Sequence, residues 1–193
     1  MTRLFTAIEL SASVRDALAA QQTRLQAVLH STGDRGLRAV SAAQLHLTLV
    51  FIGEVADPGV PSIVDALSQE MPIPPFEVHF SGWGMFPPRG APRVLWCGVG
   101  RGSKELAALH EQIATRLERV GIAREPRAYH PHLTLGRWRD GASARLREAL
   151  PPPALVATEQ VQRVTLFRSR LGPRGAEHTP LARAPLAAAA GPH

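Results

Sequence analysis

Two short segments with almost the same sequence carry the residues of this chain that are best suited to chemistry. The segments His46–Leu49 and His132–Leu135 both read His-Leu-Thr-Leu, and one lies in each half of the 193-residue chain. In an extended strand, successive side chains point to opposite faces. Each segment therefore presents an imidazole and a hydroxyl on one face, and two leucines on the other face anchor the strand in a core.

Paired imidazoles suit a reaction that needs an acid and a base at the same time. Because the imidazole pKa lies nearest to neutrality, two rings in one cleft can supply a neutral base and a protonated acid near pH ~7. In-line attack at phosphorus needs both, since one group takes a proton from the incoming hydroxyl and the other protonates the departing oxygen. Thr48 and Thr134 share the faces of His46 and His132, where they can donate to phosphate oxygens that gain charge.

Two simpler explanations of the paired segments stay open. They can be strands of a duplicated fold whose histidines only line a solvent-exposed surface. The threonines are then explained by the high β-propensity of this residue. Two histidines can also bind a metal ion, but neither segment has a third histidine or a carboxylate at a helpful spacing. His130 shares the strand parity of His132 and is expected to reach the cleft. Three further histidines stand alone and are expected at the surface or in packing: His79, His110 and His178.

The charge of the chain favours an anionic partner. The formal net charge is +6 at pH 7, and Lys104 is the only lysine, so the positive charge is almost all arginine. Arginine suits bidentate phosphate contacts, and a basic surface attracts polyanions such as RNA. A genome biased toward Ala, Gly, Pro and Arg explains the same excess equally well.

The rest of the composition indicates a cytoplasmic globular protein. No run approaches the ~20 apolar residues that a membrane span requires, and the first residues do not have the pattern of a secretory signal. The only cysteine, Cys97, has no partner for an internal disulfide. We therefore expect a cytoplasmic location and no membrane partner.

The elements that must position the two segments follow from hydrophobic periodicity and turn signals. Helices are predicted after a cap at Ser11 or Ser13, over Pro61–Met71, after a cap at Ser103, and near Ser143–Leu150. Further strands are predicted over Arg3–Glu9, Phe76–Phe80, Arg93–Val99 and Gln160–Arg168, with weak pairing over Pro180–Ala184. The order helix, histidine strand, helix, strand occurs once in each half, which favours a duplicated α+β fold with antiparallel sheets. Simple alternation places Phe51 with the leucines of its strand and points Arg137 away from His132.

These residues resemble the two-histidine (2H) phosphoesterase superfamily, whose signature is a pair of His-x-Thr-x motifs. Four flanking segments are similar to its bacterial RNA 2′,3′-cyclic phosphodiesterase branch, formerly called 2′-5′ RNA ligase: Arg3–Leu10, Leu45–Val55, Pro131–Arg137 and Leu166–Leu171. The resemblance implies a bilobal fold of two antiparallel sheets flanked by helices, with a pseudo-twofold axis and a central cleft. The resemblance extends to about Pro185 and predicts a single bilobal domain over residues 1–185, and the Ala/Gly/Pro-rich composition of residues 186–193 predicts a flexible C-terminal tail.

The resemblance implies metal-independent hydrolysis of an RNA terminal 2′,3′-cyclic phosphate to a 2′-phosphate, without a cofactor. By position, His46 would be the proton donor to the leaving 3′ oxygen and His132 the proton acceptor that activates water. Thr48 and Thr134 would hold the phosphate oxygens. The sequence alone does not decide which histidine is the acid and which is the base.

Two positions depart from the family pattern and leave other activities open. Val50 and His130 stand where such relatives often have lysine and arginine, so two fixed positive charges near the cleft are replaced. His130 and Arg137 are further candidates for phosphate binding. The expected partners are RNA ends or nucleoside 2′,3′-cyclic phosphates, bound by a monomer. The alternatives are 2′-5′ RNA ligation or hydrolysis of a small cyclic nucleotide at the same site, and a non-catalytic RNA-binding module.

Overall fold

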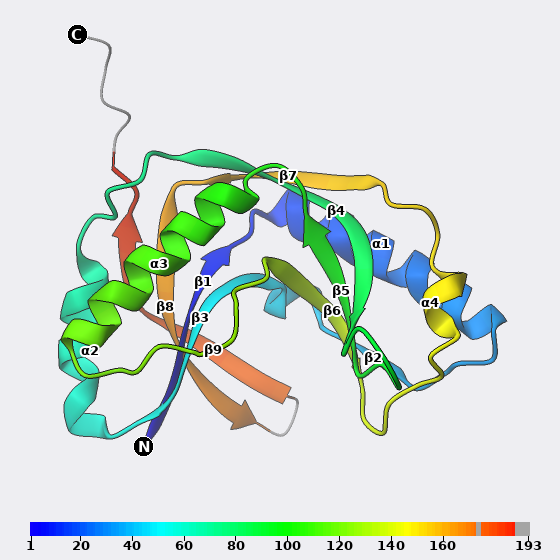
Figure 1. Ribbon diagram of the computed structural model, residues 1–193, viewed down its shortest axis with the longest axis horizontal. Coiled ribbons are helices and arrows are strands. Elements are labelled where there is room, and N and C mark those ends of the chain that lie inside the picture. The colour runs from blue at the N-terminus through cyan, green and yellow to red at the C-terminus, as the bar shows by residue number, and fades with distance from the viewer. Residues whose placement is uncertain (173–174, 188–193) are drawn as a thin grey trace, which may run out of the picture.

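The strands form two antiparallel sheets in the computed structural model, which describes residues 1–172 and 175–187 (Figure 1). In spatial order, the four-stranded sheet contains β3 (His46–Val55), β1 (Thr2–Glu9), β8 (Arg163–Gly172) and β9 (Gly175–Pro185). The five-stranded sheet contains β2 (Leu37–Ala39), β6 (His132–Trp138), β5 (Val94–Val99), β4 (Phe76–Phe86) and β7 (Leu155–Val161). The predicted α+β class with antiparallel sheets is confirmed.

The two sheets repeat one strand order. The order β3-β1-β8-β9 in the first sheet corresponds to β6-β5-β4-β7 in the second, and β2 is added beyond β6. The histidine strands β3 and β6 thus occupy equivalent places and also contact each other. This duplicated, bilobal arrangement is the one that the sequence predicts.

Two of the helices, α1 (Ala12–Ser31) and α3 (Ser103–Arg119), pack against the sheet opposite to the one they follow. Further helices are α2 (Val60–Ser68) and the short α4 (Leu146–Ala149). Although α1 follows β1 of the four-stranded sheet, it contacts β7 of the five-stranded sheet (Figure 1). Although α3 follows β5 of the five-stranded sheet, it contacts β3 of the four-stranded sheet. No helix in the described part of the chain is long and apolar enough to cross a membrane.

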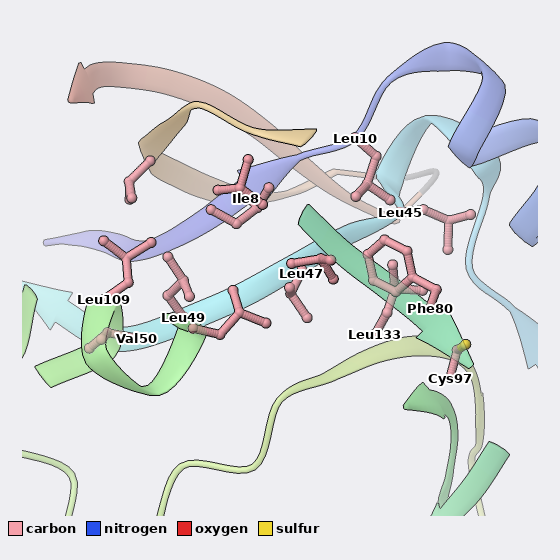
Figure 2. Packing of buried hydrophobic residues seen from close by; sticks show 14 of the residues in the cluster. Ile8, Leu10, Leu45, Leu47, Leu49, Val50, Phe80, Cys97, Leu109 and Leu133 are labelled. Atoms are coloured by element: carbon pink, nitrogen blue, oxygen red, sulfur yellow. The ribbon is translucent and has the colours of Figure 1, made fainter. Parts of the chain in front are cut away.

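One buried cluster joins the backs of both histidine strands. Leu47 and Leu133 are each 0% exposed and belong to this cluster together with Leu109 of α3. Figure 2 shows Leu47 and Leu49 of β3 gathered with Leu109, Leu133 and Phe80 in a common core. Burying a leucine side chain stabilises a fold by about 1.5–3 kcal/mol, so the leucines of the two segments fix the strands that carry the histidines.

The C-terminal region differs from its prediction. Instead of weak pairing over Pro180–Ala184, β9 covers Gly175–Pro185 and pairs with β8 along its length. The predicted tail also begins too early, because Leu186 is only 5% exposed and the Ala187 N–H donates to the Met71 carbonyl at 2.9 Å. The tail prediction for residues 188–193 lies outside the described residues.

Candidate active site

The structure brings the two histidines and the two threonines of the repeated segments together. His46, Thr48, His132 and Thr134 all line one cleft with a volume of about 280 Å³. The first pair comes from β3 and the second from β6, so each sheet contributes one imidazole and one hydroxyl. Within the described residues, neither threonine hydroxyl is engaged in a hydrogen bond to protein, which leaves both available to a bound group.

Each imidazole is oriented by the backbone immediately before its strand. The Nδ1 of His46 lies 2.7 Å from the carbonyl oxygen of Gln44, and the Nδ1 of His132 lies 2.7 Å from that of His130. A carbonyl oxygen only accepts, so each Nδ1 carries a hydrogen and donates it. Each neutral ring therefore keeps a bare Nε2 as the nitrogen that is free to exchange a proton with a substrate.

Burial and neighbouring cations lower the pKa of both rings. Removal from water, then the charges of His178 and Arg137, lower the pKa of His46 from 6.5 to about 4. Burial, then the charges of His130 and Arg137, lower the pKa of His132. Both rings are therefore mostly neutral in the free cleft at neutral pH, unlike the neutral and protonated pair expected from the sequence. A bound phosphate anion favours the protonated forms and so raises both pKa values.

Two β-bulges bring into the cleft side chains that simple alternation places elsewhere. The pairing of β3 with β1 skips Leu49, and the pairing of β6 with β5 skips Leu135. An extra residue in one strand reverses the alternation of the residues that follow it. Phe51, which is 57% exposed, and Arg137 consequently line the cleft with the histidines, so the predicted orientation of both is wrong.

His178 is a cleft residue that the sequence interpretation missed. It was expected at the surface or in packing, but β9 places it in the cleft, with its ring centroid 5.2 Å from that of His46. The ring also packs at 4.9 Å against Phe5 in an edge-on arrangement. Only the pairing of β9 with β8 brings it there, and no local motif signals that pairing.

The other three histidines singled out in the sequence, His79, His110 and His130, lie outside this cleft. His130 lines an adjoining groove, with its ring centroid 6.2 Å from that of His132. His79 is paired with Glu77 at 2.6 Å, and His110 of α3 donates from Nδ1 to a backbone carbonyl of β3. Across residues 1–172 and 175–187, no group of three or more His, Cys, Asp or Glu side chains is placed to hold a metal ion.

The cleft continues into two grooves of different character. One, of about 640 Å³, shares Arg3 and Ser169 with the cleft and adds Arg168 and Arg170. The other, of about 560 Å³, shares Thr48, Phe51 and His132 with the cleft. It adds a mostly apolar wall: Phe86, Pro87, Pro88 and Tyr129. A substrate larger than a single phosphate group therefore has on one side a polar groove, lined by three arginines and by Glu54 and Asp57, and on the other side an apolar groove.

Comparisons with known proteins find similar sequences over most of the chain. Residues 10–173, which include both histidine strands, match the family described as the 2′-5′ RNA ligase superfamily. An RNA 2′,3′-cyclic phosphodiesterase of Thermus thermophilus is 34% identical over 93% of this chain and 87% of its own length. The Escherichia coli protein of the same description is 30% identical over 94% of each chain.

Solved structures of similar proteins share the fold. The crystal structure of E. coli LigT complexed with 3′-AMP has a TM-score of 0.78 and 28% sequence identity, over 96% of this chain and 98% of that chain. The crystal structure of TT0787 of T. thermophilus has a TM-score of 0.75 and 30% identity, over 95% of this chain and 97% of that chain.

Proposed function

Because the chain belongs to the 2′-5′ RNA ligase superfamily, we propose that it is an RNA 2′,3′-cyclic phosphodiesterase. It opens the terminal cyclic phosphate of an RNA to a 2′-phosphate and a free 3′-hydroxyl, without a metal ion or cofactor. The observation that carries this proposal is the single cleft in which two imidazoles and two hydroxyls, one of each from either sheet, meet. The names of the similar phosphodiesterases support the choice of substrate.

The two imidazoles act as base and acid in one in-line displacement. The Nε2 of His132 accepts a proton from water as the water oxygen bonds to phosphorus. The bond between phosphorus and the 3′ oxygen breaks, and that oxygen takes a proton from the Nε2 of His46. His46 must therefore be protonated in the complex, which requires the phosphate anion to raise its pKa from the value of about 4 in the free protein.

Polar side chains around the phosphate stabilise the charge of the transition state. Thr48 and Thr134 donate their hydroxyls to the non-bridging oxygens, on which negative charge builds. Arg137 adds a guanidinium from β6, a geometry suited to phosphate. His130 lines the adjoining apolar groove and contacts the substrate next to the phosphate.

A defined RNA end tests the proposal. An oligonucleotide that ends in a 2′,3′-cyclic phosphate is incubated with the protein in EDTA, and the terminal group is mapped. We expect a 2′-phosphate and a bell-shaped dependence of kcat/KM on pH. Since both histidine pKa values are lowered in the free protein, that bell is centred below pH 6.5. Binding without turnover would favour an RNA-binding module, and turnover only with added metal would refute the acid–base mechanism.

Ligation is the second candidate activity, because the matched family is described by it. The same groups can join a cyclic phosphate to a 5′-hydroxyl, because that hydroxyl replaces water as the nucleophile while the bond from phosphorus to the 3′ oxygen breaks in the same way, whereas abundant water favours hydrolysis. A nucleoside 2′,3′-cyclic phosphate fits the same chemistry as a smaller substrate. Mixing the cyclic-phosphate oligonucleotide with a 5′-hydroxyl acceptor and searching for a 2′-5′ linkage separates the two reactions.

We also propose that the protein acts as a monomer in the cytoplasm. A single chain supplies all four motif residues of the cleft, so the site is complete without a second copy. The only cysteine, Cys97, is buried, and burial raises the pKa of its thiol to about 12. With this single cysteine the chain cannot form an internal disulfide, as is usual for proteins of a reducing compartment.

A further inference from the structure

Each β-bulge behind the cleft is held by a side chain from the helix that crosses over from the other sheet. In β6, the Leu135 carbonyl accepts a hydrogen bond from Nε2 of Gln22 in α1. The same Nε2 donates to the Val40 carbonyl at 2.8 Å, and the Val40 N–H donates to the Leu135 carbonyl at 2.9 Å. Gln22 therefore ties the bulge to the segment that follows β2.

The bulge of β3 is held in an equivalent way. The Leu49 carbonyl accepts a hydrogen bond from Nδ1 of His110 in α3 at 2.9 Å. The His110 ring stacks on Tyr129 at a centroid distance of 4.4 Å, and the Tyr129 hydroxyl donates to the Thr48 carbonyl at 3.2 Å. Leu49 and Leu135 are the last residues of the two repeated segments, so the two contacts are counterparts.

Gln22 lies where packing alone would favour an apolar residue. It is 6% exposed and shares the buried face of α1 with Leu18, Leu25 and Leu29. A buried amide is costly unless its polar atoms are hydrogen-bonded, so its presence requires partners of matching geometry. Here both partners are carbonyls at or next to the bulge.

We propose that Gln22 is a positioning residue for Arg137: by holding the Leu135 carbonyl it maintains the bulge that turns the guanidinium into the cleft. Its consequence for catalysis rests on the proposed function, whereas the positioning itself does not. Only Gly136 lies between Leu135 and Arg137 along β6, so a change in the bulge passes directly to the Arg137 side chain. His110 is the counterpart that maintains the bulge carrying Phe51.

The position of Arg137 can be followed through the pKa values of His46 and His132. His46 faces the charges of His178 and Arg137, and His132 faces those of His130 and Arg137; Arg3 of β1 also lines the cleft. The Arg137 charge lowers the pKa of both catalytic rings. If the bulge is released and Arg137 turns away, both of these pKa values rise.

The first experiment compares Gln22→Met with a matched control on the same helix. Gln26→Met removes an amide one turn further along α1 that donates to the Leu37 carbonyl at 3.5 Å and touches no bulge. The imidazole C–H signals are titrated by NMR in both variants. We expect the pKa values of His46 and His132 to rise in Gln22→Met and to stay unchanged in Gln26→Met.

The second experiment tests whether Gln22 acts through Arg137. Arg137→Gln alone should raise both imidazole pKa values, and adding Gln22→Met should then cause no further rise. In hydrolysis, Gln22→Met should lower kcat/KM by about 10-fold, as expected for the loss of one charge-assisted hydrogen bond, and shift the pH optimum upward.

Two results would overturn the inference: unchanged imidazole pKa values in Gln22→Met, or a rise that adds fully to that of Arg137→Gln. If Gln22→Met does not fold, Gln22→Asn keeps the amide but is too short to reach both carbonyls, and it should give the same rise. The NMR readout needs no turnover. A wild-type protein without hydrolytic activity would therefore refute the proposed function and leave the positioning test intact.

Discussion

The surroundings of the two histidine strands differ far more than the strands themselves. Beside β3, the His46 ring packs against Phe5 and His178, and the following bulge presents Phe51. Beside β6, the His132 ring packs against Phe86 and Trp96, and the corresponding bulge presents Arg137. The backbone of the two strands is duplicated, whereas the neighbouring side chains make the two halves chemically different.

These surroundings lower the proton affinity of both imidazoles, through different neighbours. The pKa of His46 falls to about 4, with burial as the largest cause, and the pKa of His132 is also lowered. Two rings in identical surroundings would compete for the same proton. An acid–base pair requires one ring to be protonated while the other stays neutral. In the proposed roles the protonated ring is His46, so a bound phosphate must raise the pKa of this ring from its value of about 4 in the free protein.

The largest expected effect comes from removing either ring. His46→Ala and His132→Ala should each lower kcat by ~10²–10⁴-fold, because in the proposed mechanism each removes a group that transfers a proton in the transition state. A cyclic phosphorothiolate with sulfur in place of the 3′ oxygen distinguishes them, since a thiolate leaves without a proton. We expect this substrate to restore turnover in His46→Ala and not in His132→Ala. Restoration in His132→Ala alone would reverse the two roles.

A smaller effect concerns stability in acid. In the unfolded chain a histidine binds a proton below pH ~6.5, but folded His46 does so only below about 4. As pH falls through this window, the unfolded state binds more protons than the folded state. The free energy of unfolding therefore decreases by roughly 3 kcal/mol by pH 4. His46→Gln lacks this proton uptake, so its free energy of unfolding should fall less than that of the wild type.

Denaturant titrations between pH 7 and pH 4 measure this difference. His132→Gln is the matched control from the other strand, because the His132 ring is less deeply buried. Equal pH dependence in the wild type and in His46→Gln would show that the His46 pKa is not lowered in the folded protein.

The smallest expected effects on catalysis come from Arg137 and Phe51, the two side chains that the bulges turn into the cleft. Arg137→Gln should lower kcat/KM for the cyclic phosphate by roughly 10–100-fold, the usual cost of losing a hydrogen bond to a charged group. Phe51→Leu keeps an apolar side chain at the equivalent position of β3 and should change kcat/KM by less than about 3-fold. Steady-state kinetics on one substrate compares them. A larger loss in Phe51→Leu than in Arg137→Gln would mean that the apolar wall contributes more than the guanidinium.

The sequence was most informative where structure depends on local pattern. The two histidine strands, the leucines behind them and the antiparallel α+β class were predicted correctly, because alternation and helical periodicity act over a few residues. The orientations of Phe51 and Arg137 were wrong, because a bulge is defined by the register with a partner strand.

The positions of residues that depend on contacts between distant parts of the chain could not be predicted from the sequence. His178 enters the cleft through the pairing of β9 with β8, and Gln22 meets β6 because α1 crosses to the other sheet. In the sequence, Gln22 interrupts an otherwise apolar stripe of the first helix. That interruption is a usable signal, but its partner is visible only in the folded chain.

The crossing of α1 and α3 also bears on how such a molecule can arise and move. A half-length ancestor with one histidine strand and one helix would bury that helix only by exchanging it with a second copy, as in a domain-swapped dimer. The present chain contains both copies in covalent form. Because α1 and α3 each pack against the opposite sheet, a hinge-like opening of the two lobes would separate both helices from their leucine contacts. We therefore expect the cleft to keep its shape when a substrate binds.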